Sequence, residues 1–173
     1  MRSKKLYLFV EGDDDERFFK RIVELKLKGK YEEAKIIKYA EKPNEYVESF
    51  IRSIKSIGAD YLFFADIDRA PCITKRKQDI KSKLNSIDLD RIVVVKAEIE
   101  SWYLAGLDDK NSKKLKIKNF QNTDNITKEQ FNSLMPKKFD SRIDFMIEIL
   151  NNFSIEVAKT KNSSFKYFVE KHC

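Results

Sequence analysis

The chain has 173 residues, a length that ordinarily forms one domain or one domain with a small extension, and that argues against a large multidomain assembly. Its 42% hydrophobic content, with thirteen Phe and seven Tyr but only four Gly and three Pro, excludes the disordered and fibrous classes. Lys and Arg exceed Asp and Glu by 35 to 28, and the net charge of +7 suits a polyanionic partner or simply a Lys-rich surface.

Short apolar runs alternate with segments of helical periodicity over the first 106 residues. In chain order this pattern predicts a strand at Leu6 to Val10, a helix from about Asp13, a strand at Lys35 to Tyr39, a helix from about Asn44 to Gly58, a strand at Tyr61 to Ala65, a helix near Lys75 to Asn85, a strand at Ile92 to Val95 and a helix opening near Glu98. Because strands that alternate with helices form parallel crossovers, we expect an α/β, Rossmann-like fold. Its sheet should be mainly parallel, four-stranded and flanked by helices.

The pattern changes after Leu107. Residues 108–125 are polar, and Lys113 to Lys118 alternates charged and apolar side chains, which is typical of an edge strand that resists aggregation or follows phosphates. Helix-like segments follow at 127–134, 141–150 and 163–171. Since residues 109–173 carry 13 Lys and Arg against 8 Asp and Glu, most of the surplus positive charge lies here. We expect a core of residues 1–106 and a basic helical C-terminal extension of residues 107–173 packed on it.

Two features bear on the cellular compartment. Cys72 and Cys173 lack the spacing of a zinc or disulfide motif, which favours a reducing cytosol. The apolar run Leu6 to Val10 is too short for a signal peptide or a membrane span. We therefore expect a cytoplasmic protein with no membrane partner.

Acidic residues follow three of the four predicted strands: Glu11, then Asp66 with Asp68, then Glu98 with Glu100. Ligands of open α/β sheets bind at the carboxyl ends of the strands. Two carboxylates ~4 Å apart repel by roughly 4 kcal/mol at an effective dielectric near 20, so a cluster of them recruits a cation or takes up protons. Oxygen ligands select hard ions such as Mg²⁺ or Mn²⁺. Taken singly, the same acids can also be helix caps or solvated loop residues.

The residues of this edge resemble a known family. Leu6 to Gly12, with Asp15 one helical turn after Glu11, resembles the first motif of TOPRIM domains, a strand followed by Glu-Gly and a further acid. Phe64 to Asp68 is similar to the TOPRIM Asp-x-Asp motif. Ala97 to Leu104 and Asn162 to Phe168 resemble elements of small stand-alone TOPRIM proteins related to the overcoming-lysogeny-defect (OLD) family nucleases.

This resemblance implies a TOPRIM-like fold and a Mg²⁺- or Mn²⁺-dependent nuclease that hydrolyses phosphodiesters of DNA or RNA, in defence against foreign nucleic acid. Glu11, Asp66 and Asp68 match the catalytic positions. The metal ligands that it implies are Glu11, Asp15, Asp66, Asp68, Glu98 and Glu100. Because no GxxxxGK[ST] motif occurs, the ATPase of the larger nucleases is either absent or supplied by a separate chain. The sequence leaves open a monomer or a homodimer.

Cations follow the Asp-x-Asp motif directly, and we expect them to bind nucleic acid, although a solvated helix start would look the same. They are Arg69, Lys75, Arg76 and Lys77.

Two other functions fit the acids that follow the predicted strands. One is a haloacid-dehalogenase-like phosphatase with Asp66 as the nucleophile, although Arg69 to Pro71 replace its usual small residues. The other is a non-catalytic TOPRIM-like regulatory or partner protein.

Overall fold

The computed structural model describes residues 4–173, and the chain forms two compact units, one up to Val94 and one from Val95 to Cys173. This boundary lies earlier than the one expected at residue 106. The reason is that helix α4 (Ile99–Ala105) packs with the C-terminal helices α6, α7 and α8, so it belongs to the second unit.

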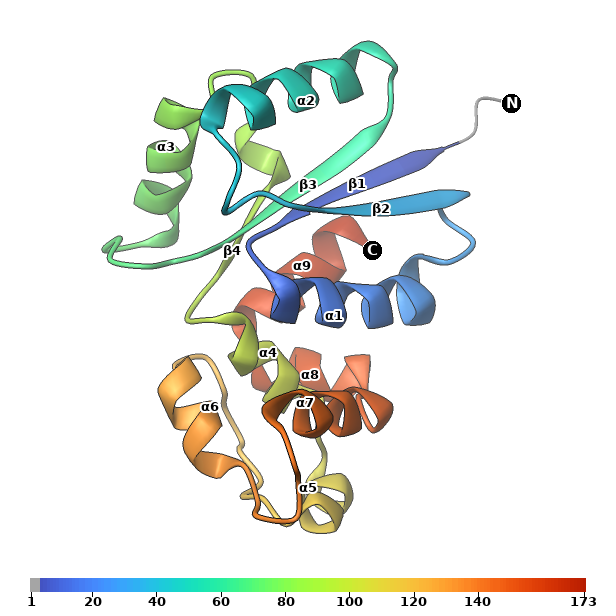
Figure 1. Cartoon of the computed structure of the whole chain (residues 1–173), viewed down its shortest axis with the longest axis vertical. Helices are drawn as coiled ribbons and strands as arrows, with labels where there is room; N and C mark the ends of the chain where they lie inside the picture. The colour runs from blue at the N-terminus through green and yellow to red at the C-terminus, as the bar shows by residue number, and fades with distance from the viewer. Residues whose placement is uncertain (1–3) are drawn as a thin grey trace. The chain divides into compact units, whose positions relative to one another are not determined.

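The sheet contains β1 (Lys5–Val10), β2 (Glu33–Lys38), β3 (Asp60–Asp66) and β4 (Ile92–Val95). The strands lie in the order β2-β1-β3-β4 and are all parallel (Figure 1). Leu8 of β1 is paired with Ile36 of β2 and with Leu62 of β3. The predicted α/β class with a four-stranded parallel sheet and C-terminal helices is confirmed.

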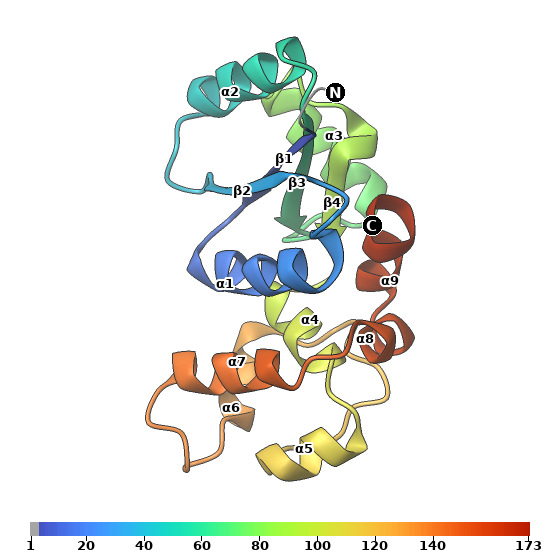
Figure 2. The same ribbon diagram turned by 90° about the vertical axis from the view of Figure 1, so that its right-hand side faces the viewer.

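Helices cover both faces of this sheet (Figures 1 and 2). They are α1 (Asp13–Ile22), which continues as a π-helical turn at Val23–Leu27, α2 (Asn44–Ser56), α3 (Ile73–Lys83) and a 3-10 turn at Leu89–Arg91. Because successive strand side chains point to opposite faces, Phe63 packs with α2 and α3 while its neighbour Phe64 packs on α1. The Phe64 ring lies 4.1 Å from that of Phe19. β1, β3 and β4 are therefore buried on both faces, which is why their sequences are continuous apolar runs.

The second unit is helical. Besides α4 it contains α5 (Asp109–Leu115), α6 (Lys128–Leu134), α7 (Arg142–Asn151), α8 (Ile155–Lys161) and α9 (Ser163–His172). The helices predicted at 127–134, 141–150 and 163–171 are confirmed, whereas α8 was not predicted. Thr127 and Ser141 cap α6 and α7 through their side chains. Trp102 packs on Phe165 and Phe168 in the core, with ring centroids 5.1 Å and 5.6 Å apart.

The edge strand predicted at Lys113 to Lys118 is wrong, because residues 109–115 form helix α5. The Asp108 carboxylate accepts a hydrogen bond of 2.7 Å from the amide of Asn111 and starts the helix. Leu115 is buried, and Lys116 ends the helix in the left-handed conformation with φ 61°. Local capping and burial of one leucine therefore outweigh the alternating pattern.

Across residues 4–173, no helix combines the length and the apolar character that are needed to cross a membrane.

Candidate functional site

Glu11 and Asp66 lie together at the topological switch point of the sheet. β1 and β3 are neighbours, and their crossovers lead to opposite edges, to β2 and to β4. Glu11 follows β1 directly, and its Oε1 accepts a hydrogen bond of 3.2 Å from the backbone amide of Asp66, the last residue of β3. Open α/β sheets bind their ligands at such a point.

Tyr39 joins these two strand ends. Its hydroxyl donates to the carbonyl of Phe64 at 2.8 Å and lies 3.4 Å from Glu11 Oε1. Burial raises the pKa of Tyr39 well above its usual value, and the charges of Glu11, Asp15 and Asp66 raise it further. The phenol is therefore a neutral donor set among three carboxylates. The sequence pattern does not reveal this role, although it places Tyr39 at the end of the second predicted strand, on the ligand-binding edge.

Arg76 on α3 holds the turn that follows β3. Its Nε donates to the backbone carbonyl of Asp66 at 2.7 Å, and its Nη2 lies 2.7 Å from Asp68 Oδ2. Asp68 has φ 50°, a left-handed conformation that Asp tolerates better than most residues. The alternation of side-chain direction along β3 thus ends at Asp66. The turn that follows directs the Asp68 carboxylate to the Arg76 guanidinium.

The Glu11 carboxyl is destabilised in its charged form. Burial raises its pKa, and the nearby charge of Asp68 raises it further, while the Asp66 amide, Arg76 and the Tyr39 hydroxyl oppose the rise. A carboxylate kept partly out of water beside a second acid is an arrangement characteristic of functional sites.

Asp15 has a structural role at the start of α1. Its Oδ2 accepts a hydrogen bond of 3.3 Å from the amide of Gly12, the residue that precedes the helix. Its charge still acts on Tyr39, so Asp15 lies near the acids at the strand ends.

Glu98 and Glu100 belong to the second unit, where each has a partner. Glu100 is 3% exposed and pairs with Arg142 on α7. Glu98 accepts a hydrogen bond from the backbone amide of Lys128, at the start of α6. Both bonds tie α4 to neighbouring helices, so each acid has a structural function within its unit. Their assignment as metal ligands stays a prediction.

The described side chains contain no group of three or more His, Cys, Asp or Glu arranged to hold a metal ion. The donors at the strand ends nevertheless fit a hard divalent cation in kind, because they are carboxylate oxygens, and burial together with the charge of Asp68 raises the pKa of Glu11. The positive charge beside Asp68 is supplied by Arg76. A cation bound by Asp68 would therefore either use Oδ1 beside this guanidinium or replace Arg76 at Oδ2.

The predicted nucleic-acid-binding cations lie beside this site. Arg69, Lys75 and Arg76 line a surface hollow of about 590 Å³ together with Asp68 and Asp79. Lys75 is paired with Asp79 at 2.8 Å, whereas Arg69 is exposed. A second hollow of about 600 Å³ runs past Glu11 and β2.

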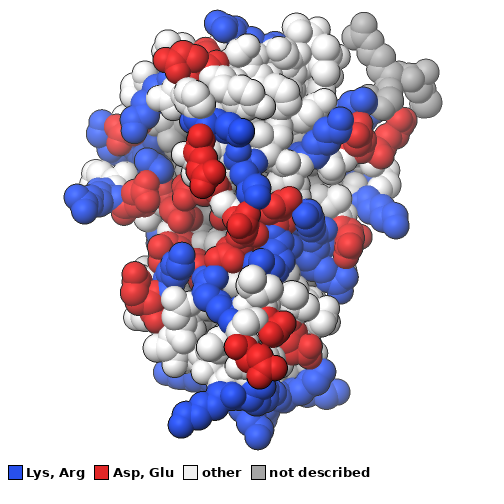
Figure 3. Space-filling model, viewed as in Figure 1, with Lys and Arg blue, Asp and Glu red and all other residues white. Residues whose placement is uncertain are grey.

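Lys77 is only partly exposed and is not among the residues that line either hollow. Figure 3 shows Lys and Arg intermixed with Asp and Glu over the visible face.

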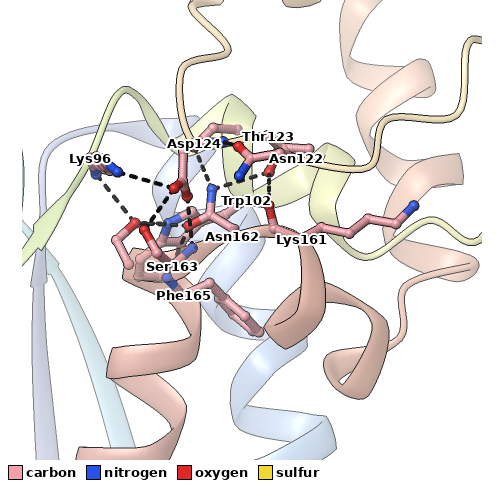
Figure 4. A network of polar contacts seen from close by, with 11 residues as sticks. Lys96, Trp102, Asn122, Thr123, Asp124, Lys161, Asn162, Ser163 and Phe165 are labelled. Atoms are coloured by element: carbon pink, nitrogen blue, oxygen red, sulfur yellow. Dashed lines mark hydrogen bonds and ion pairs between the residues drawn. The ribbon is translucent and has the colours of Figure 1, made fainter.

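The segment Asn162 to Phe168 has a structural explanation in the second unit (Figure 4). Asp124 accepts hydrogen bonds from the amide and hydroxyl of Ser163, at 2.7 and 2.8 Å, and pairs with Lys96 at 3.1 Å. Burial of Asp124 favours its neutral form, but these contacts outweigh it and lower the pKa of the carboxyl.

Asn162 and Ser164 complete this network. Asn162 Oδ1 caps α9 by accepting from the amide of Phe165 at 3.0 Å, and Ser164 Oγ accepts from the Trp102 indole at 2.9 Å. The residues that resemble an Asn-x-Ser-Phe ending therefore fasten α9 to α4 and to the loop at Asp124.

Comparisons of the chain with protein-family models, with curated proteins and with solved structures find no match.

Proposed function

We propose that the protein is a Mg²⁺- or Mn²⁺-dependent nuclease of TOPRIM type that hydrolyses phosphodiesters in DNA or RNA. The observation that carries this proposal is the hydrogen bond between Glu11 and the amide of Asp66. It brings acids from two strand ends to the switch point of a parallel sheet, where a substrate can reach them. The OLD family assignment, a role in defence and a separate ATPase subunit belong to the same proposal.

Glu11, Asp66 and Asp68 would hold the divalent cation. Bound there, the cation would polarise the phosphoryl group and lower the pKa of an attacking water. The raised pKa of Glu11 supports a second role, because such a carboxylate takes up a proton near neutral pH more readily than an ordinary one. The Tyr39 hydroxyl lies 3.4 Å from Glu11 Oε1 and could donate its proton there in place of the Phe64 carbonyl.

Cations next to the acids would balance the charge of the substrate. Arg69 is exposed on the rim of the hollow that Asp68 also lines, where it can meet a phosphate. Arg76 positions the turn from Asp66 to Asp68 and is available to a phosphate oxygen when Asp68 turns to a metal ion.

The test is cleavage of supercoiled plasmid, single-stranded DNA and RNA in Mg²⁺, in Mn²⁺ and in EDTA. We expect metal-dependent cleavage that the double variant Asp66→Asn/Asp68→Asn loses by at least a hundredfold, with an unchanged circular dichroism spectrum. A matched control, Asp90→Asn/Asp140→Asn, removes the same charge from exposed positions and should cleave like the parent.

Equal cleavage by the Asp66→Asn/Asp68→Asn protein would refute the assignment of these acids. Absence of cleavage together with covalent trapping of Asp66 by beryllium fluoride would favour the phosphatase. Absence of both, with no heat of Mn²⁺ binding in calorimetry, would favour a non-catalytic partner protein.

A further inference from the structure

A cavity of about 180 Å³ opens in the first unit between α2 and α3, over the carboxyl ends of β2 and β3. It adjoins the two hollows beside the acids, because Ala40 and Lys42 also line one of them and Arg76 also lines the other. Its apolar lining comes from four buried side chains, which are Val47, Phe63, Ile80 and Leu84. Tyr39 forms another part of the wall, with its ring stacked on Phe63 at 4.3 Å.

The size of the cavity restricts its occupant. An apolar cavity of about 150 Å³ holds one benzene-sized ring, whereas drug-sized ligands need about 300 Å³ or more. The observed 180 Å³ therefore suits a single planar ring system, and the rest of a larger ligand would have to lie outside it. The polar part of such a ligand would have to lie at the rim.

The charges around the rim are all positive. Lys42, Arg76 and Lys83 line the cavity, and no carboxylate does. Lys42 and Lys83 are exposed, and within residues 4–173 neither forms an ion pair. Asn44, the first residue of the 13-residue helix α2, also lines the cavity, and the positive end of a helix favours an anion. The rim thus offers cations and a helix amino end to an anion such as phosphate.

Two residues are shared between this cavity and the acids. Tyr39 lines the cavity, and its hydroxyl reaches Glu11. Arg76 lines it as well, and its guanidinium reaches Asp66 and Asp68. A single side chain, either Tyr39 or Arg76, would therefore separate a ligand in the cavity from the acids of the proposed catalytic centre.

We propose that this cavity binds one nucleotide of a single-stranded nucleic acid, with the base against the apolar wall and a phosphate at Lys42 and Lys83. The proposal deepens the function proposed above and rests on it for the identity of the polymer. The nucleotide would anchor the strand beside the acids without itself being cleaved.

Calorimetric titration in EDTA with AMP, adenosine and ribose 5-phosphate tests the site without turnover. We expect the Kd of AMP to be at least tenfold lower than the Kd of adenosine and than the Kd of ribose 5-phosphate. The charge reversal Lys42→Glu/Lys83→Glu should weaken AMP binding at least tenfold. A matched reversal, Lys26→Glu/Lys28→Glu, lies near the opposite end of β2 and should leave binding unchanged. Ile80→Phe should fill the cavity and exclude AMP, and circular dichroism checks that each variant folds.

The outcomes separate this proposal from the nuclease. If AMP binds no more tightly than ribose 5-phosphate, or if Lys42→Glu/Lys83→Glu binds AMP like the parent, the nucleotide site is refuted even when the protein cleaves nucleic acid. If Asp66→Asn/Asp68→Asn retains AMP binding and the parent cleaves nothing, the cavity stands and the nuclease fails.

Discussion

Glu11 Oε1 accepts a hydrogen bond from the amide of Asp66, a residue 55 positions further along the chain. This contact joins the carboxyl ends of β1 and β3, and Tyr39 and Arg76 flank it with one neutral and one positive donor. Four residues from four different segments thereby converge at the switch point of the sheet.

Glu11→Gln should not destabilise the protein near neutral pH in EDTA. The raised pKa means that charged Glu11 opposes folding, a cost that grows as the pH rises through its folded-state pKa. Gln removes the charge and retains an oxygen that accepts from the Asp66 amide. Chemical denaturation at pH 7 should give a free energy of unfolding equal to or above that of the parent, while cleavage is lost. A clear loss of stability would instead make Glu11 a structural residue.

Arg76→Gln should lower the free energy of unfolding by about 1–3 kcal/mol. The guanidinium side chain is only 17% exposed, and its removal leaves the Asp66 carbonyl and the Asp68 carboxylate without their donor. Urea denaturation measures the change, and Arg69→Gln, an exposed neighbour, is the control that should have little effect. An Arg76→Gln protein as stable as the control would show that the guanidinium does not hold this turn.

Asp124→Asn should destabilise the second unit in a pH-dependent way. The pKa of Asp124 is lowered in the folded protein, so its contribution is present above the unfolded value of about 4 and is lost as the pH falls through the folded-state pKa. We expect a deficit of roughly 1.5–3 kcal/mol at pH 7, since charged hydrogen bonds are lost. Denaturation of parent and variant between pH 7 and pH 3 measures it. A deficit that stays constant down to pH 3 would contradict the role given to the charge.

Gly106→Ala should destabilise the protein by about 1–3 kcal/mol or more, because a Cβ at this position would lie 2.1 Å from the Phe153 ring. Gly12→Ala is the control, since no atom would lie within 4 Å of a Cβ added at this position. Thermal denaturation compares the two. A Gly106→Ala protein that melts with the parent would mean that Phe153 moves away at little cost.

The order of strands and helices in the first unit follows from local chemistry, and the sequence was sufficient for it, whereas α5 and α8 of the second unit were not predicted. Continuous apolar runs predicted β1, β3 and β4, and the helix-like segments at 127–134 and 141–150 predicted α6 and α7. The alternating segment from Lys113 to Lys118 predicted an edge strand wrongly, because alternation alone does not show which side chains the fold buries. In the structure Leu115 is buried and residues 109–115 form helix α5.

The sequence by itself determined the parallel α/β class and the position of acids after strands, because both depend on residue types within a few positions of one another. Only the tertiary structure decided which partners those acids have. Arg76 faces Asp68, Tyr39 faces Glu11, and Glu100 pairs with Arg142. Such pairings join residues 8 to 42 positions apart, and their energies depend on distance and burial, which a linear sequence does not contain.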